Sequence, residues 1–289
     1  ISQRSSAMAK IEELLPDYTE YRDVFLSPAQ AAAIVKPNTL LFVVDVHRPA
    51  LTAAPQLLEL VDRVVVIDHH RRSEDFIVNP MLVYLEPSAS STGELVTELL
   101  MYFDDRLELT RLEASVLYAG IVVDTKNFTV QTGVRTFDAA AYLRRAGADP
   151  GLVRHLFKVD LDTVKLHAEI ITNTEMLPGG VAIATCPYPM NNAQIIAAQT
   201  ADGLLNVEGV RVSFVIFLLD DGVGVSARSL GDVNVQVIME QLGGGGHQTV
   251  AGAQIKNAQI DEVKEKILAL ITEYIKESEQ SESHSAGRS

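Results

Sequence analysis

The sequence predicts an α/β protein built from two domains. Its 289 residues, 47% of them hydrophobic, are enough to bury more than one core. Short runs rich in β-branched residues alternate with longer segments whose apolar residues recur at helical spacing, which is typical of an α/β fold. Pro178, Gly179 and Gly180 interrupt this pattern, and strand and helix signals resume after them, so we expect a domain change there.

The first half begins with a predicted βαβ unit. Leu40 to Val44 and Val64 to Ile67 indicate buried parallel strands, and Pro49 to Leu60 offers room for a crossover helix between them. Asp45 and Asp68 directly follow these strands. Because ligand sites of open α/β sheets lie at the carboxyl ends of the strands, both aspartates are candidates for a site.

Four further helices are predicted before the domain change. Their apolar residues recur at helical spacing over residues 91–100, 112–123, 137–145 and 152–176, the last as a long connecting helix. The second of these helices places Asp124 at its end, and Gly147 suits the termination of the third.

The second half is predicted to contain four strands and three helices. The strands are expected at 181–185, 210–219, 222–228 and 251–256, and the helices at 192–204, 234–242 and 262–275. Asp220, Asp221 and Gly222 provide a hairpin turn. We expect residues 1–150 to form the first domain, 151–179 a connecting helix and linker, 180–277 the second domain, and the serine-rich residues 278–289 a disordered tail.

Composition restricts the partners and the compartment. The formal net charge of −14 disfavours a surface that follows a long nucleic acid, although a small nucleotide is compatible with it. No apolar run approaches the roughly 20 residues that cross a bilayer, so we expect no membrane contact from this chain. Cys186 is the single cysteine, which excludes an intramolecular disulfide and favours a reducing, cytoplasmic setting.

Asp45, the run Asp68-His69-His70 and Asp124 form the first candidate site. Oxygen ligands mixed with imidazole suit Mn²⁺ or Mg²⁺. Two such ions bridged by Asp45 would activate a water and stabilise charge on an attacked phosphoryl group, so the predicted chemistry is phosphoester hydrolysis. Taken singly, Asp45 or Asp124 is better explained as a turn or helix cap. Three consecutive ionisable residues after a buried strand need polar partners, and this favours a site.

Gly243 to Gly246, followed by His247, form the second candidate site. Glycines let the main chain approach a ligand closely and present N–H groups to phosphate oxygens. Arg228, within the run Ser226 to Ser229, would hold a phosphate through two parallel hydrogen bonds, and Asn234 follows shortly after. The alternative is a flexible turn with an incidental histidine, which the presence of the first constellation disfavours.

Together, the two constellations resemble the DHH/DHHA1 phosphoesterases. Asp68-His69-His70 with Asp45 upstream and Asp124 downstream resembles the DHH domain, and Gly244 to His247 resembles the DHHA1 partner domain. The likeness covers nearly the whole chain. It is most specific to the GdpP-type branch, the cyclic-di-AMP phosphodiesterases, in the stretches VVIDHHRR, VYLEPSASSTGELVTELL, AGIVVDTKNF, RTFDAAAYLRRAGADP and SARSLGDVNVQVIMEQLGGGGH.

The resemblance implies a fold and a reaction. A DHH domain with a mainly parallel sheet flanked by helices would precede a smaller α/β DHHA1 domain with a mixed sheet. Cyclic di-AMP would be hydrolysed to linear pApA at a centre of two Mn²⁺ ions, with Mg²⁺ as the alternative metal. Asp45 would bridge the ions, His69 and Asp124 would bind one of them, and Asp68 would orient the site. His70 would contact the reacting phosphate or assist the leaving oxygen.

Substrate contacts would come mainly from the DHHA1 domain. The resemblance assigns them to Arg228, Asn234, Gly245, Gly246 and His247, with Ser90, Ser91 and Thr92 as further candidates. Members of this branch usually carry membrane helices, a PAS-like domain and a degenerate GGDEF-like domain upstream, which would place the catalytic part at the cytoplasmic face of the membrane. Oligomeric state and selectivity between adenine and guanine stay open, with a homodimer as one option.

One family motif is absent. A histidine followed by two aspartates, in the pattern H-x-x-x-D-x-D, should precede Asp45, but residues 1–44 contain no histidine, and Asp17 and Asp23 do not fit the spacing. The motif follows a central strand in the family, so its loss would expose apolar neighbours. We therefore expect the sequence to be part of a longer chain. As it stands, we expect slower hydrolysis than from an extended form, because too few anionic ligands would hold a second ion.

Other functions compete with this hypothesis. A module that binds cyclic dinucleotides without cleaving them fits the incomplete ligand set. A DHH/DHHA1 oligoribonuclease acting on short linear RNA such as pApA would share the metals and the glycine-rich loop. A RecJ-type exonuclease is disfavoured by the net charge of −14. A family II pyrophosphatase is disfavoured by the glycine run, because that family carries a different partner domain.

Overall fold

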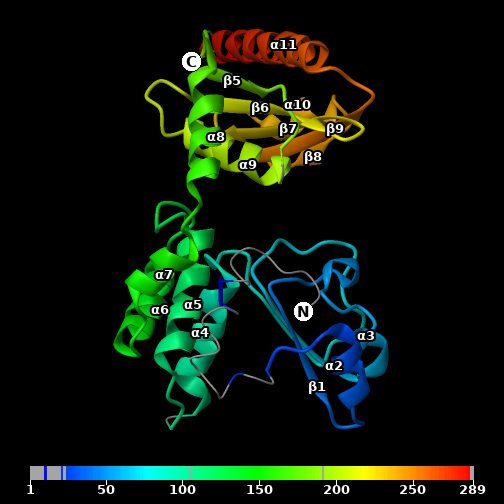
Figure 1. Cartoon of the computed structure of the whole chain (residues 1–289), viewed down its shortest axis with the longest axis vertical. Coiled ribbons are helices and arrows are strands. Elements are labelled where there is room, and N and C mark those ends of the chain that lie inside the picture. The colour runs from blue at the N-terminus through cyan, green and yellow to red at the C-terminus, as the bar shows by residue number, and fades with distance from the viewer. Residues whose placement is uncertain (1–9, 12–20, 22–23, 105, 191, 287–289) are drawn as a thin grey trace. The chain divides into compact units, whose positions relative to one another are not determined.

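A computed structural model describes residues 10–11, 21, 24–104, 106–190 and 192–286. The chain divides into two compact units, residues 1–158 and 159–289. The first unit holds a parallel sheet of three strands, and the second holds a mixed sheet of six strands (Figure 1). The predicted fold class, α/β with two sheets flanked by helices, is confirmed.

The sheet of the first unit has the order β1-β2-β3, with β1 spanning Leu40–Val44, β2 Arg63–Asp68 and β3 Leu82–Leu85. β2 is buried on both faces: Val64 and Val66 pack toward Leu58, while Val65 and Ile67 pack toward Leu95. This two-sided burial explains why the sequence of β2 contains a continuous apolar run.

β1 corrects one expectation. The strand has the predicted bounds, but Leu40, Phe42 and Val44 are exposed, so it is not a buried strand. It lies at the edge of the sheet, where alternate side chains point away from the neighbouring core. β3, which the sequence did not predict, forms the opposite edge.

The helices of the first unit include two corrections. The single crossover helix expected between the first strands is instead a short 3₁₀ turn and one α-helical turn, because Pro55 lacks the N–H that a continuous helix would use. Residues 152–176 do not form one long helix, because Asp160 caps a new helix start by accepting from the Thr163 N–H. The elements are α2 Pro28–Ile34, η3 Pro49–Leu51, α3 Leu57–Leu60, α4 Thr92–Phe103, α5 Arg111–Asp124, α6 Val134–Arg145 and α7 Pro150–Leu156.

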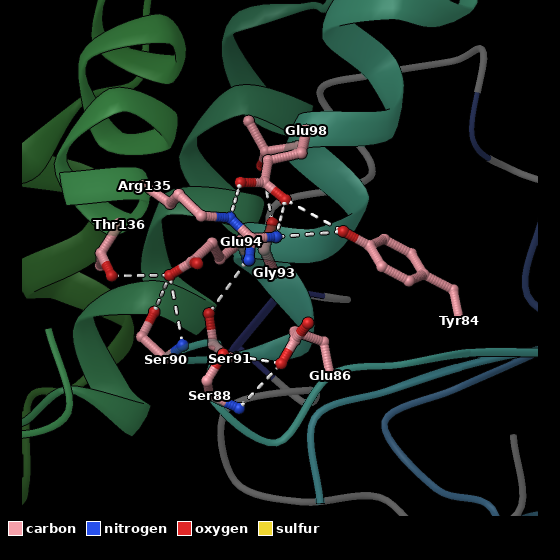
Figure 2. Close-up of polar contacts among 11 residues, drawn as sticks. Tyr84, Glu86, Ser88, Ser90, Ser91, Gly93, Glu94, Glu98, Arg135 and Thr136 are labelled. Atoms are coloured by element: carbon pink, nitrogen blue, oxygen red, sulfur yellow. Dashed lines mark hydrogen bonds and ion pairs between the residues drawn. The ribbon is translucent and has the colours of Figure 1, made fainter. Parts of the chain in front are cut away.

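Two glutamates on α4 tie this helix to its neighbours, as Figure 2 shows. Glu94 is buried and accepts hydrogen bonds from the Ser90 hydroxyl at 2.6 Å and the Thr136 hydroxyl at 2.6 Å. One turn farther along α4, Glu98 accepts from two nitrogens of the Arg135 guanidinium, at 2.6 and 2.5 Å. The α4–α6 contact is therefore fixed by charge-assisted bonds as well as by apolar packing.

The Glu98–Arg135 pair makes stability depend on pH. The hydrogen-bonded Arg135 guanidinium holds the pKa of Glu98 below its ordinary value. Such a carboxylate stabilises the folded state above its unfolded pKa of about 4.3, and the contribution is lost as the pH falls through the lower folded pKa. We expect Glu98→Gln to lower the free energy of unfolding by about 1 kcal/mol at neutral pH.

Urea unfolding of wild type and Glu98→Gln at pH 7 and at pH 3 measures this contribution. The two proteins should differ at pH 7, and the difference should shrink toward pH 3 as the pH falls through the lowered pKa of Glu98. Glu108→Gln, at an exposed glutamate of the same unit, is the control and should match wild type at both values. A difference that is as large at pH 3 as at pH 7 would show that the ion pair is not its source.

The second unit has the strand order β4-β5-β6-β7-β9-β8. β5 and β6 are parallel, and the other neighbours are antiparallel. Asp220 and Asp221 form the turn between β6 and β7, as predicted. The elements are α8 Leu161–Thr172, β4 Glu175–Leu177, β5 Val181–Cys186, α9 Ala193–Leu204, β6 Val212–Leu219, β7 Gly222–Ser229, α10 Val235–Glu240, β8 Gly245–Gly246, β9 Val250–Lys256 and α11 Ile260–Ala286.

Both faces of the second sheet are covered by helices (Figure 1). Alternate residues of β5 separate the two cores: Val181 and Ile183 join the core under α10 and α11, and Ala182 and Ala184 join the core under α8 and α9. The glycine-rich segment before β9 is thereby fixed at one edge of a well-packed sheet.

The end of the chain differs from the prediction. α11 continues through Ala286, so the tail expected to be disordered from residue 278 is helical as far as Ala286, while residues 287–289 lie outside the described part. Glutamate, glutamine and alanine in this segment are good helix formers, and extending an existing helix avoids the cost of nucleation. None of the helices in the described ranges is both long and apolar enough to cross a membrane.

Candidate active site

Asp45 lies immediately after β1 in an unusual backbone conformation. Its φ is 64°, in the left-handed region, which costs a residue other than glycine roughly 1–2 kcal/mol. Its backbone N–H donates to the Ile67 carbonyl at 3.0 Å, and its carboxylate accepts from the Thr92 hydroxyl at 2.8 Å. Strand pairing and α4 therefore both hold this carboxylate in place.

Three of the predicted metal-ligating side chains come together from different elements. His69 follows β2, and its Nε2 lies 3.7 Å from an Asp45 oxygen and 3.6 Å from an oxygen of Asp124, the last residue of α5. Neighbouring ligands on an octahedral ion stand about 3 Å apart, since each bond is about 2.1 Å long. His69 is thus close to each of the two carboxylates at a separation that a shared cation requires.

The electrostatics of the cluster favour a cation. Burial, together with the neighbouring Asp45 carboxylate, raises the pKa of Asp124 above its ordinary value, although His69 opposes this effect. Ligand atoms of Asp45, His69 and His70 also lie within 4.8 Å of one another. Carboxylate oxygen mixed with imidazole nitrogen suits a divalent ion of the Mn²⁺ or Mg²⁺ class, so the residues present fit such a metal.

Asp68 does not face the cluster. Its side chain is completely buried, and Oδ1 accepts from both the backbone N–H of His70 at 3.1 Å and the His70 ring Nδ1 at 2.7 Å. Burial alone would raise the pKa of Asp68, but hydrogen bonds from His70 and His47 outweigh it and lower the pKa. The Nε2 atom of His70, whose side chain is 56% exposed, is left available to a ligand.

The hydroxyl residues before α4 have internal partners. The Ser90 hydroxyl donates to Glu94, and the Ser91 hydroxyl accepts from the Glu94 N–H as the cap of α4, and both serines are buried (Figure 2). Thr92 donates to Asp45, as described above. The structure therefore gives these three side chains positioning contacts inside the first unit, and their expected contacts with substrate stay a prediction.

A cavity of about 590 Å³ in the second unit contains most of the other predicted residues. Arg228, Gly245, Gly246 and His247 line it, while Asn234 does not. Asn234 instead caps α10 by accepting from the Gln236 N–H. The complete lining is Gln194, Ala198, Phe217, Val225, Ser226, Arg228, Gly243, Gly244, Gly245, Gly246, His247, Val250, Ala251, Gly252, Ala253 and Gln254.

Arg228 brings a positive charge to this cavity. Its side chain is 11% exposed, its Nε donates to Asp202 at 3.2 Å, and one terminal nitrogen donates to the Ala227 carbonyl at 2.9 Å. These bonds restrict the guanidinium to one orientation. A guanidinium held in a cavity lined by glycines suits a phosphate, because the main chain there can approach a ligand closely.

The two units each match a family model. The "DHH family, N-terminal domain" model matches residues 5–121, and the "DHHA1 domain" model matches residues 179–277. The chain belongs to the DHH/DHHA1 family.

Individual members of the DHH/DHHA1 family are similar over most of this chain. "Cyclic-di-AMP phosphodiesterase GdpP" from Geobacillus thermodenitrificans is 50% identical over 270 residues, which cover 92% of this chain and 41% of that protein. "Bifunctional oligoribonuclease and PAP phosphatase NrnA" from Thermus thermophilus is 28% identical over 262 residues, covering 90% of this chain and 76% of that protein. The chain thus spans less than half of the first relative.

A solved structure supports the fold. An exopolyphosphatase-related protein from Bacteroides fragilis superimposes with a TM-score of 0.73 at 18% identity, covering 90% of this chain and 76% of that chain. At this identity the likeness shows a shared fold alone.

His47 is a site residue that the sequence did not reveal. It follows the strand-end Asp45 by two positions, is buried, and its Nδ1 lies 2.5 Å from Asp68. A second histidine close to a strand-end aspartate was the available signal. Gln194, which lines the cavity of the second unit, had no recognisable signal.

The glycines of the DHHA1 loop have two different roles. A Cβ at Gly246 would lie 2.4 Å from the Val250 carbonyl oxygen, and its φ is 147°, whereas a Cβ at Gly245 would meet nothing within 4 Å. We expect Gly246→Ala to lower the free energy of unfolding by roughly 1–3 kcal/mol. Gly245→Ala should leave stability unchanged and weaken the binding of a ligand to the cavity, because the added methyl enters it.

Thermal unfolding and calorimetric titration with cyclic di-AMP separate these roles, with each variant serving as the control for the other. If Gly245→Ala binds as tightly as wild type, the loop backbone does not approach the ligand. Equal stability of Gly246→Ala and wild type would contradict the packing role of Gly246.

Proposed function

We propose that this DHH/DHHA1 chain is a metal-dependent phosphodiesterase that hydrolyses cyclic di-AMP to linear pApA. The observation that carries the proposal is the convergence of Asp45, His69 and Asp124 from β1, β2 and α5. The similarity to the Geobacillus protein, whose name states this substrate, supports the choice of cyclic dinucleotide.

Asp45, His69 and Asp124 would hold Mn²⁺, with Mg²⁺ as the alternative metal, and Asp45 would supply a carboxylate to both ions of a two-metal centre. When bound, such ions polarise phosphoryl oxygens and lower the pKa of a bound water. The strained backbone at Asp45 and its bond from Thr92 fix the carboxylate before the metal arrives, so little reorganisation accompanies binding.

The reaction opens one of the two phosphodiester bonds of the ring. A water oxygen forms a bond to phosphorus, the bond from phosphorus to the 3′ oxygen breaks, and a proton reaches the leaving 3′ oxygen. Linear pApA with a terminal 5′-phosphate results. His70 presents Nε2 to the solvent side of the site while Asp68 holds Nδ1, so His70 suits contact with the reacting phosphate or proton delivery to the leaving oxygen.

The DHHA1 unit would contribute binding and no metal ligand. Arg228 supplies a fixed positive charge, Gly245 an accessible backbone, and His247 an exposed imidazole at the edge of the same cavity. Together these groups suit a phosphate of the dinucleotide.

A second candidate is hydrolysis of short linear RNA, because the Thermus relative is named an oligoribonuclease. Purified protein with Mn²⁺ should be given equal concentrations of cyclic di-AMP and pApA in separate reactions, with products resolved by ion-exchange chromatography. We expect pApA to accumulate from the cyclic substrate. Conversion of pApA to mononucleotide with the cyclic substrate left intact would favour the second candidate.

A further inference from the structure

We propose that His47 is a positioning residue for the proposed hydrolysis: it holds Asp68 so that Asp68 fixes both the backbone and the ring of His70. This inference rests on the proposed function, which gives His70 contact with the reacting phosphate. His47 itself is only 3% exposed and has no path to a substrate.

The contacts of His47 show which ring nitrogen donates to Asp68. Nε2 lies 3.2 Å from the backbone nitrogen of Ser73 and 3.0 Å from its hydroxyl, so both contacts of Nε2 are with Ser73. Nδ1 faces the carboxylate of Asp68, and a carboxylate can only accept, so Nδ1 carries a proton. That proton points to Asp68 Oδ2 at 2.5 Å, and His47 is a donor to Asp68.

Asp68 divides its two oxygens between two histidines. Oδ2 takes the bond from His47, and Oδ1 takes both bonds from His70, through the backbone N–H and the ring Nδ1. Because the carboxylate is fully buried, it has no water to turn toward. Fixing Oδ2 fixes the carboxylate plane, and the plane determines where Oδ1 holds the His70 ring.

His47 is held firmly enough to act in this way. Its ring stacks on Phe76 with centroids 5.0 Å apart and an angle of 22°, and its carbonyl accepts from the Ile77 N–H at 2.9 Å. The guanidinium carbon of Arg72 lies 4.6 Å from the centroid of the Phe76 ring. The segment after the Asp68-His69-His70 run is thus folded back over the end of β1.

Two amide substitutions of His47 separate hydrogen bonding from packing. The side-chain amide of asparagine occupies the position of Nδ1 and can still donate to Asp68, whereas that of glutamine extends to the position of Nε2 and faces Ser73. We expect His47→Gln to lower kcat for cyclic di-AMP roughly 10- to 100-fold with KM unchanged, and His47→Asn to recover most of the loss. His155→Gln, at an exposed histidine of the same unit, is the control.

The nitrogen chemical shifts of the His70 ring provide a readout that does not depend on turnover. In wild type and His47→Asn, Nδ1 should show the shift of a protonated nitrogen that donates to Asp68, while His47→Gln should give a mixture of protonated and unprotonated Nδ1. Unchanged His70 shifts and an unchanged kcat in His47→Gln would overturn the proposal. If wild type cleaves no cyclic dinucleotide, the proposed function fails, and the His70 shifts alone decide whether His47 positions that ring.

Discussion

Asp45→Asn is expected to lower kcat for cyclic di-AMP by roughly a hundredfold or more, which is about 3 kcal/mol of transition-state stabilisation. Asparagine tolerates the left-handed backbone that position 45 adopts at φ 64°, so the substitution removes the ligand charge and leaves the main chain as it is. The Thr92 hydroxyl can donate to the remaining amide oxygen. Turnover at saturating Mn²⁺ and calorimetric Mn²⁺ binding should both be impaired.

Asp62→Asn is the matched control for this variant. Asp62 directly precedes β2, so it lies at the amino end of the strand whose carboxyl end carries Asp68 and His69. Its kcat and its melting temperature should equal those of wild type. Near-wild-type turnover by Asp45→Asn at saturating Mn²⁺ would remove Asp45 from the metal centre.

Arg228→Ala should weaken binding of cyclic di-AMP by roughly 10- to 100-fold while Mn²⁺ binding stays unchanged. A charge-assisted hydrogen bond contributes about 1.5–3 kcal/mol, and the side chain is already held by Asp202 and the Ala227 carbonyl in one orientation toward the cavity. Calorimetry with the dinucleotide and, separately, with Mn²⁺ measures both quantities.

Arg211→Ala tests whether the loss of any arginine from the second unit is enough to weaken binding of cyclic di-AMP. Arg211 makes an ion pair with Asp232 at 2.6 Å, as Arg228 does with Asp202, but it does not line the cavity. It should bind the dinucleotide like wild type. If the two variants weaken binding equally, the effect is general electrostatics, and the argument for a phosphate contact at Arg228 fails.

The elements that could be predicted from the sequence are those whose burial is periodic or complete. β2 and the β6–β7 hairpin have continuous apolar runs with turn residues beside them, so their positions follow from local pattern. β3 has four residues, two of them exposed, and pairs with β2 among the described residues. Its sequence lies in the short apolar run Met81 to Leu85, which is too short for periodicity to identify it as a strand. The helix break before Asp160 depends on a capping bond that competes with an apolar periodicity continuing across it.

Some residues of the candidate site could likewise be predicted from the sequence, and others could not. Asp45 and His69 could be placed together because parallel strands end at one edge of the sheet. His47 lies two residues after Asp45 at the same edge, but its role depends on partners 21 and 26 residues farther along the chain, and no periodic signal joins it to them. The roles of Ser90 and Ser91 depend on the burial of Glu94. The sequence does not indicate that this helical glutamate is buried.

Product formation from cyclic di-AMP, followed by ion-exchange chromatography with Mn²⁺ and after chelation by EDTA, tests the central claim most directly. The geometry of Asp45, His69 and Asp124 predicts that pApA accumulates with Mn²⁺ and that EDTA stops its formation. Cyclic di-AMP that stays intact with Mn²⁺ present, or pApA formation that continues unchanged in EDTA, would contradict a metal-dependent phosphodiesterase.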